Sequence, residues 1–203
     1  FKNQKKSDFA FLDNKQLINI YKKKKLKGNL NIISNKNFKL IKIKIKNIYF
    51  ETNINNQNLV FAYHLIKKLK ISDNTFINSM NTFKGLDHRY QIIYKNKFIT
   101  CINDSKATSF DATKHALMNS KNIYWILGGL PKRGDIFNFK NFKKNIIRGY
   151  VIGRNINFYK KNLKKKIDFV ISKTLQKAII QICFSIKYDK KKNKVILFSP
   201  SAA

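Results

Sequence analysis

Residues 98–134 constrain the fold most strongly, because they contain two short apolar runs that each end in a polar loop. The first run, 98–102, leads into the hexad Asn-Asp-Ser-Lys-Ala-Thr at 103–108. The second run, 123–127, leads into two glycines and a basic loop at 128–134. Short apolar runs that alternate with helical patterns are typical of a parallel sheet buried on both faces. Ligands bind beyond the carboxyl ends of such strands, so we expect a site at these two loops.

The rest of the chain after residue 98 continues this alternation of strand and helix. Between the two apolar runs we expect a helix with one face made of Ala112, His115, Ala116 and Met118. Further strands are expected at 149–153, 168–172 and 194–198, and further helices at 139–146, 155–163 and 174–186. In the last helix, the residues expected to point inward are Leu175, Ala178, Ile179 and Ile182. Five strands with four crossover helices predict a doubly wound α/β domain.

The chain before residue 98 is less regular. Lys and Ile alternate over 41–46, which predicts a strand with one exposed face. An Asn-rich segment at 53–58 precedes apolar residues at 59, 62, 65, 66 and 69, which predicts a capped helix with a buried stripe. We also expect strands at 8–13 and 30–34, helices at 16–26 and 75–83, and an alternating segment at 90–94. The segment from Gly85 is typical of a hinge, and we place a domain boundary near it.

The net charge of +33 is compatible with nucleic-acid binding, but the composition favours another cause. The chain has 43 basic residues, and only four of them are Arg. Lys, Asn and Ile can all be encoded by A and T alone, so an AT-rich genome enriches the three together. Nucleic-acid binders rely on Arg for bidentate contacts, which Lys does not replace. We therefore expect no specific nucleic-acid partner, and a basic nucleic-acid-binding module remains the alternative.

The two cysteines, Cys101 and Cys183, lie in apolar runs and are expected to be buried thiols in a reducing cytoplasm. Neither they nor the three dispersed histidines have metal-ligand spacing, so we expect no metal site within this chain. No apolar run approaches the roughly 20 residues that span a bilayer, so we expect no membrane span and a cytoplasmic protein. The chain lacks an initiator Met and stops just after an apparent strand, so we expect a longer parent protein.

The polar loops carry the residues with the clearest chemistry. Asp104 directly follows a strand, where a carboxylate can accept a hydrogen bond from a ribose hydroxyl. Lys106, Thr108 and Lys132 offer two cations and a hydroxyl that would suit an anionic substrate. Spacing alone leaves open that these are ordinary loop residues. The sequence has neither a Gly-x-Gly-x-x-Gly nor a Gly-x-x-x-x-Gly-Lys-Ser/Thr pattern.

Four segments together resemble the successive signatures of the Mur ligase family: residues 87–89, 103–108, 128–132 and 197–203. The hexad at 103–108 favours the member that adds D-glutamate, because other members carry different hexads there. The family has a UDP-binding domain, a central ATPase domain and a Rossmann-like C-terminal domain. The resemblance implies that residues 1–85 are the C-terminal part of the central ATP-binding domain. Residues 86–203 would then be a truncated, Rossmann-like, doubly wound α/β domain.

The resemblance also implies contacts with ATP. Asn55 and Asn58 match the family's adenine-contacting asparagines, while Ile54 stands where the family has His. Arg89 matches an arginine at the domain hinge that reaches the ATP phosphates, and Asp104 matches the aspartate that binds ribose.

Three further residues match the reacting end of the family's site. Lys106 matches the lysine beside the ribose-binding aspartate, so Arg89 and Lys106 are the implied catalytic cations. Thr108 and Lys132 match residues that hold the carboxylates of D-glutamate.

The implied activity is an ATP-dependent ligase of peptidoglycan synthesis. It would add D-glutamate to UDP-N-acetylmuramoyl-L-alanine through an acyl phosphate, with ATP and Mg²⁺ as cofactors. The family's phosphate-binding loop and most magnesium ligands should lie upstream, so we expect this chain alone to be an inactive monomer. Another amino-acid ligase of the same superfamily, such as a folylpolyglutamate synthase, is the second alternative.

Overall fold

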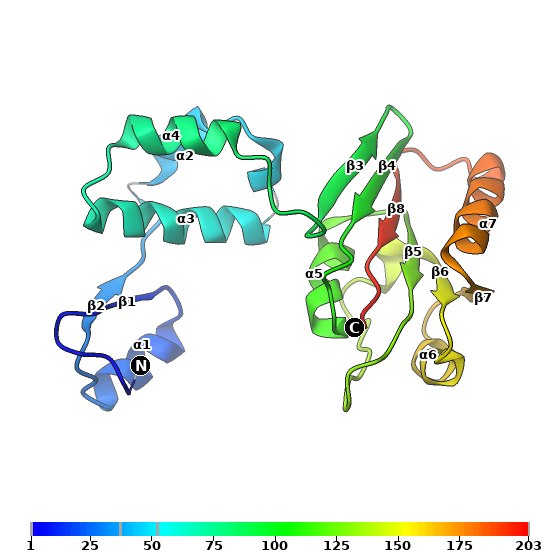
Figure 1. Ribbon diagram of the computed structural model, residues 1–203, viewed down its shortest axis with the longest axis horizontal. Coiled ribbons are helices and arrows are strands. Elements are labelled where there is room, and N and C mark those ends of the chain that lie inside the picture. The colour runs from blue at the N-terminus through cyan, green and yellow to red at the C-terminus, as the bar shows by residue number, and fades with distance from the viewer. Residues whose placement is uncertain (1, 37, 52, 203) are drawn as a thin grey trace. The chain divides into compact units, whose positions relative to one another are not determined.

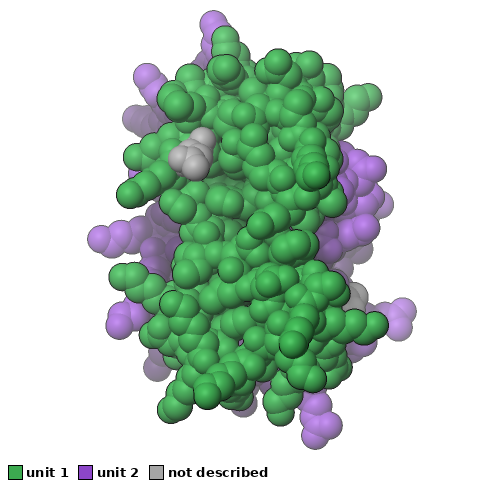
Figure 2. Space-filling view, turned by 90° about the vertical axis from the view of Figure 1, so that its left-hand side faces the viewer, with its two compact units in different colours: residues 1–84 green, residues 85–203 purple. Residues whose placement is uncertain are grey.

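The computed structural model describes residues 2–36, 38–51 and 53–202, and the side chains of residues 53 and 54 also lie outside this description. The chain divides into two compact units, Phe1–Lys84 (unit 1) and Gly85–Ala203 (unit 2). Figure 1 labels the helices and strands, and Figure 2 colours the two units separately.

Unit 1 combines a two-stranded parallel sheet with helices. Its elements are β1 (Phe9–Leu12), α1 (Lys15–Lys23), β2 (Asn29–Ile32), α2 (Phe38–Lys44), a 3-10 turn (Ile48–Glu51), α3 (Asn53–Lys68) and α4 (Asp73–Thr82). Strands β1 and β2 pair in parallel and form a small core with α1. The other helices share a second core. The strands predicted near residues 9 and 30 and the helices near 16 and 75 are confirmed.

The strand predicted at 41–46 is wrong, because this segment is covered largely by helix α2. Phe38, Ile41 and Ile45 are buried together, at the spacing of one helical face. Ile43 is 74% exposed, although a strand would place it beside Ile41 and Ile45. Spacings of two and of about four both fit residues 41 and 45, and burial of Phe38 favours the helix.

Substitutions on α2 distinguish these two structures. We expect Ile41→Lys to destabilise the chain by about 3 kcal/mol, because it buries an unpaired charge in a packed core. The matched change Ile43→Lys should cost less than about 0.5 kcal/mol, because this side chain already faces solvent. Urea unfolding of both variants measures the difference, and equal losses of stability would contradict the helix.

Helix α3 buries part of the predicted stripe. Leu59 is buried, and Ala62 and Ile66 pack half-buried against the same core, whereas Leu65 and Leu69 are exposed. Val60 and Tyr63, which the stripe left out, are also buried. The ring of Tyr63 packs between Phe38 and Phe76, with ring centroids 5.4 and 5.6 Å away. Packing against the aromatic rings of α2 and α4 therefore places Tyr63 at the centre of the buried face of α3.

Unit 2 is a six-stranded sheet with the order β3-β4-β8-β5-β6-β7. Its elements are β3 (Gln91–Lys95), β4 (Ile99–Asn103), α5 (Phe110–Asn119), β5 (Ile123–Leu127), β6 (Ile146–Ile152), α6 (Ile156–Leu163), β7 (Phe169–Lys173), α7 (Leu175–Tyr188) and β8 (Lys194–Phe198). Strand β3 is antiparallel to β4, and the other neighbouring strands are parallel. The predicted doubly wound α/β fold is confirmed.

The two faces of this sheet have separate cores. Side chains of β5 alternate between them: Ile123, Trp125 and Leu127 join one core, and Tyr124 and Ile126 join the other. The first core contains residues of α5 and α6, and the second contains residues of α7. Figure 1 shows α5 and α7 on opposite sides of the strands.

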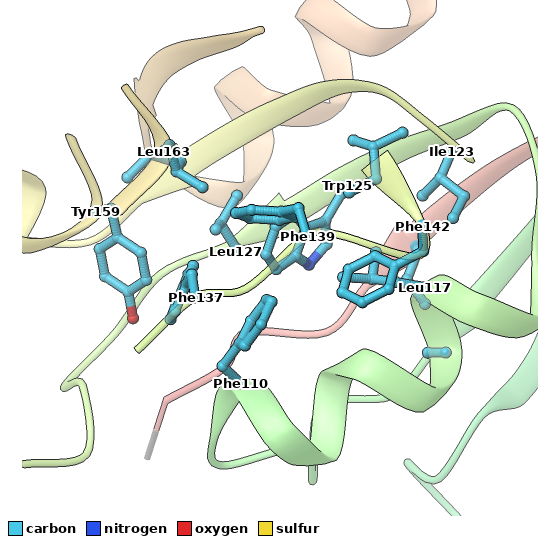
Figure 3. Close-up of a cluster of buried hydrophobic side chains, with 14 of the residues drawn as sticks. Phe110, Leu117, Ile123, Trp125, Leu127, Phe137, Phe139, Phe142, Tyr159 and Leu163 are labelled. Atoms are coloured by element: carbon cyan, nitrogen blue, oxygen red, sulfur yellow. The ribbon is translucent and has the colours of Figure 1, made fainter. Parts of the chain in front are cut away.

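The helix predicted at 139–146 is wrong. Apart from a 3-10 turn at Lys143–Asn145, this crossover is irregular, and β6 already begins at Ile146. Phe137, Phe139 and Phe142 point from it into the first core (Figure 3). Phe137 stacks on Phe110 with a centroid distance of 4.2 Å. A ring cluster thus occupies the place of a crossover helix, which hydrophobic periodicity alone does not reveal.

The predicted inner faces of α5 and α7 need correction. Helix α5 buries Phe110, Thr113, Ala116 and Leu117, while Ala112, His115 and Met118 are exposed. Its first residue, Phe110, sets this orientation by entering the aromatic cluster. Helix α7 buries Ala178 and Ile182, whereas Leu175 and Ile179 are exposed.

The two thiols also differ from the prediction. Cys183 is exposed on α7, so its predicted burial is wrong. Cys101 is only half-buried, and this burial raises the pKa of its thiol. Across the part of the chain that is described, no helix is long and apolar enough to cross a membrane.

Candidate functional site

The loops that follow β4, β5 and β8 meet at the carboxyl edge of the sheet in unit 2. The amide of Asp104, just after β4, donates to the carbonyl oxygen of Phe198 at the end of β8, at 2.8 Å. The amide of Gly128, just after β5, donates to the carbonyl oxygen of Pro200 at 3.0 Å. The segment that follows β8 therefore joins the two polar loops that the sequence singled out.

Asp104 is the acidic centre of this edge and is only 9% exposed. Its Oδ1 accepts from the amide of Tyr90 at 3.0 Å, and its Oδ2 accepts from Ser199 Oγ at 2.7 Å. Burial raises the pKa of Asp104, and these hydrogen bonds and the positive charge of Arg89 partly offset that effect. Each carboxylate oxygen has two lone pairs, so each can accept one further hydrogen bond.

The segment that carries Arg89 is bonded to the hexad. The amide of Lys106 donates to the carbonyl oxygen of His88 at 3.1 Å. The side chains of Asn103 and His88 also meet, with Asn103 Nδ2 3.0 Å from His88 Nδ1. Both cationic side chains, Arg89 and Lys106, are exposed. Two exposed cationic side chains therefore belong to segments that flank the buried carboxylate of Asp104. This arrangement suits an anionic ligand that also carries a hydroxyl group.

The loop that carries Lys132 is bonded to the start of helix α5. Asp135 Oδ2 accepts from the amide of Phe110, the first residue of α5, at 2.7 Å. The amide of Asp135 donates to the carbonyl oxygen of Lys132 at 3.1 Å. Thr108 lies two residues before α5, and both Thr108 and Lys132 are exposed. The carboxylate of Asp135 thus occupies the first amide of α5, and the exposed hydroxyl of Thr108 and ammonium group of Lys132 are the groups here that suit an anionic ligand.

Glycines permit a close approach of backbones at this edge. Gly128 has φ +137°, and a Cβ there would lie 2.1 Å from the carbonyl oxygen of Ile152 at the end of β6. Asn155 Nδ2 donates to the carbonyl oxygen of Gly129 at 2.9 Å, which joins the same loop to the start of α6. The loop between β5 and Lys132 is therefore fixed against its neighbour β6.

The two asparagines predicted to contact adenine lie in unit 1, on α3. Asn55 is half-buried, and its Nδ2 donates to the carbonyl oxygen of Tyr49 at 2.8 Å. Asn58 is exposed. The side chain of Ile54 lies outside the described residues.

Sequence reasoning missed several residues of the site. Ser199 and Tyr90 bond Asp104 from 95 and 14 residues away, and no spacing pattern indicates either contact. Asp135 had a usable signal, because the chain has only ten acidic residues and this one lies in a loop after a strand. Among the described residues, no group of three His, Cys, Asp or Glu side chains could hold a metal ion.

Curated relatives with one common name match most of this chain. Enzymes named UDP-N-acetylmuramoylalanine–D-glutamate ligase, from Wolbachia of Brugia malayi and from Rhizobium meliloti, are 32% and 33% identical over 149 residues. The enzyme of that name from Bartonella henselae is 34% identical over the same length. The chain belongs to the Mur ligase family. These matches cover 73% of this chain but only 30% to 32% of the relatives' length.

Solved structures of Mur ligases share the fold. MurF from Acinetobacter baumannii has a TM-score of 0.56 at 14% identity, over 74% of this chain and 35% of that chain. The UDP-N-acetylmuramate–alanine ligase MurC from Thermotoga maritima has a TM-score of 0.50 at 20% identity, over 75% and 35%. No protein-family model matches the chain. These likenesses concern the fold of the chain.

Proposed function

We propose that this chain forms part of an ATP-dependent ligase that joins D-glutamate to UDP-N-acetylmuramoyl-L-alanine in peptidoglycan synthesis. The observation that carries this proposal is the carboxyl edge of unit 2. There the loops after β4, β5 and β8 bring a buried carboxylate, exposed cations and the start of α5 into one bonded assembly. The relatives bear that enzyme's name, which supports the choice of substrates.

ATP would occupy the part of the site around the hexad. Asp104 accepts a hydrogen bond from a ribose hydroxyl, because its oxygens retain free acceptor positions. Arg89 and Lys106 balance phosphate charge, since both are exposed cations beside Asp104. Asn55 and Asn58, in unit 1, are the proposed adenine contacts.

D-Glutamate would occupy the part of the site at the start of α5. Lys132 and Thr108 hold its carboxylates, through an ammonium group and a hydroxyl that are both exposed. Asp135 fixes the Lys132 loop through its bond to the amide of Phe110. The amine of D-glutamate is thereby left available for reaction.

The proposed reaction has two steps. The γ-phosphoryl group of ATP passes to the carboxylate of the substrate's L-alanine, which gives an acyl phosphate and ADP. The amine of D-glutamate then attacks the acyl carbon, an amide forms, and phosphate and a proton leave. The residues of this chain act by positioning and by balancing charge, which are the main contributions of proteins to phosphoryl transfer.

Magnesium commonly balances phosphate charge in such reactions. The part of the chain that is described does not offer a group of three His, Cys, Asp or Glu side chains that could hold the ion. We propose that its ligands belong to residues outside this chain. We also propose a monomeric, cytoplasmic enzyme.

Removing the ribose hydroxyls of ATP tests the proposed nucleotide contact. We expect the purified chain to bind ATP, and to bind 2′,3′-dideoxy-ATP about tenfold more weakly, because a hydrogen bond to a charged acceptor is lost. Calorimetric titration of both nucleotides measures this ratio. Equal affinities for the two nucleotides would contradict the proposed hydrogen bond between Asp104 and the ribose.

A basic nucleic-acid-binding module is the second candidate, and the net charge of +33 favours it. Such a module would bind RNA with an affinity that falls steeply with salt and would not discriminate between the two nucleotides. Tight binding of random RNA at roughly 0.3 M salt would support this candidate over the ligase.

A further inference from the structure

A buried row of three hydroxyl groups lies behind Asp104. Ser199 Oγ is 2.7 Å from Asp104 Oδ2 and 2.9 Å from Thr113 Oγ1. Ser201 Oγ is 2.8 Å from Thr113 Oγ1. Ser199, Thr113 and Ser201 are all fully buried. The row joins the hexad loop, helix α5 and the segment that follows β8.

Counting protons gives this row one direction while Asp104 is ionised. A carboxylate has no proton to give, so Ser199 donates to Asp104. The single hydroxyl proton of Ser199 is then used, so Thr113 must donate to Ser199. By the same reasoning, Ser201 donates to Thr113. Hydrogen bonds that run in one direction polarise and strengthen one another, most of all in a buried site.

The backbone around Ser199 holds the row in place. Trp125 Nε1 donates to the carbonyl oxygen of Ser199 at 2.8 Å. The amide of Ser199 donates to the carbonyl oxygen of Ile126 at 3.2 Å. Both partners lie on the buried strand β5. The backbone of Ser199 is therefore held by β5, and its hydroxyl bonds Asp104 from this fixed position.

We propose that Ser199, Thr113 and Ser201 form a one-way hydroxyl relay that keeps Asp104 a pure hydrogen-bond acceptor at its ligand-facing side. The three are positioning residues, since they act through Asp104. The ligand is a group that donates a hydroxyl proton, such as the ribose of a nucleotide, and this part rests on the proposed function. When Asp104 takes up a proton, its carboxyl group can itself donate, so the row no longer has one required direction.

The charged surroundings of Asp104 are consistent with this role. Burial raises the pKa of its carboxyl group, and bonds from Ser199 and from the amide of Tyr90 lower it. The charges of Arg89 and of His115 on α5 act in the same direction as those bonds. Weakening the relay should weaken the hydrogen bond from Ser199 that lowers this pKa. The effect of burial would then be less offset, and the pKa of Asp104 should rise further.

Two substitutions of Thr113 form a matched pair. Thr113→Val keeps the shape of the side chain and removes its hydroxyl, whereas Thr113→Ser keeps the hydroxyl and removes a methyl group. We expect the valine variant to raise the pKa of Asp104, measured from its side-chain carboxyl ¹³C resonance and from the Tyr90 amide. The serine variant should titrate as the wild type does. A purely structural role for Thr113 predicts no change in either titration, and that result would overturn the relay.

Ser201→Ala provides a second route in case the valine variant fails to fold. It removes the far end of the relay, so we expect a smaller rise in the pKa of Asp104 than with Thr113→Val. A fold that is retained with an unchanged titration would also overturn the relay.

Nucleotide affinity tests the positioning role separately. We expect Thr113→Val to bind ATP about threefold more weakly than Thr113→Ser, because the acceptor is less polarised and less firmly placed. Equal affinities, in a chain whose Asp104→Asn variant loses ATP, would refute the positioning role. If the wild-type chain binds no ATP, the proposed function fails, and the titration in the absence of nucleotide still decides the relay.

Discussion

Gly128→Ala is expected to destabilise unit 2 by more than about 4 kcal/mol, which is enough to unfold many domains of this size. The added Cβ would lie 2.1 Å from the carbonyl oxygen of Ile152 and 2.9 Å from its amide nitrogen. Backbone atoms of a packed strand cannot move aside as a flexible side chain can. In addition, the φ of +137° at Gly128 is strained for any residue with a Cβ.

Gly134→Ala is the matched control for this prediction. Gly134 also has a positive φ, +79°, but a Cβ there would meet nothing within 4 Å. We expect this variant to lose only about 1 kcal/mol, which is the backbone cost alone. The single tryptophan, Trp125, is buried in unit 2, so its fluorescence during urea unfolding reports on this unit. Equal losses in the two variants would contradict the close approach of Gly128 to β6.

Asp104→Asn is expected to lose nucleotide binding while the fold is kept. The amide oxygen of Asn can still accept from the amide of Tyr90, and its NH₂ group can donate to Ser199, with the relay reversed. Its neutral oxygen is a weaker acceptor for a ribose hydroxyl, so ATP should bind at least about tenfold more weakly. Calorimetry and urea unfolding on the same sample separate the two effects.

Asp104→Leu is the contrasting variant. It leaves the hydroxyl of Ser199 and the amide of Tyr90 buried without this acceptor, so we expect a loss of about 3 kcal/mol in stability as well as of binding. If Asp104→Asn destabilises the chain as much as Asp104→Leu does, the bonding pattern around Asp104 is wrong.

The stabilities of the wild type and of Asp104→Asn should also differ in their dependence on pH. Burial raises the pKa of Asp104, so the folded chain holds this proton more tightly than the unfolded chain does. The resulting stabilisation is complete below the unfolded-state pKa and is lost as pH rises through the folded-state pKa. Asn does not titrate, so the Asn variant should gain stability relative to the wild type across that window.

The sheet of unit 2 was predictable because its strands are short apolar runs bounded by polar loops. Strand β8 has the predicted bounds, Lys194–Phe198, and all five side chains of β5 are buried. Helix α2 was not predictable from alternation alone, because Ile41 and Ile45 fit a strand and a helix equally well. The helix predicted at 139–146 was wrong because the side chains of Phe137, Phe139 and Phe142 are buried by ring packing, which leaves no helical periodicity in the sequence.

The site was predictable at its exposed residues and not at its supporting ones. Asp104 and Lys132 lie in polar loops after apolar strands, a position that parallel sheets commonly use for ligands. Ser199 and Thr113 look like ordinary polar residues in the sequence, and their contact joins positions 86 residues apart. Such contacts depend on how the segment that follows β8 packs against α5, which local sequence does not specify.

Binding of D-glutamate at the start of α5 tests the proposed ligase most directly. The measurement is an amide-resonance titration of the ¹⁵N-labelled chain with D-glutamate in the presence of ATP. Lys132→Ala removes the proposed carboxylate contact, and Lys121→Ala removes the same charge from an exposed position just before β5, at the opposite end of that strand. We predict saturable shifts at Thr108 and Lys132 in the wild type and in Lys121→Ala, and their loss in Lys132→Ala. Shifts that persist in Lys132→Ala, or that are absent around Thr108, would contradict a D-glutamate site at this edge of the sheet.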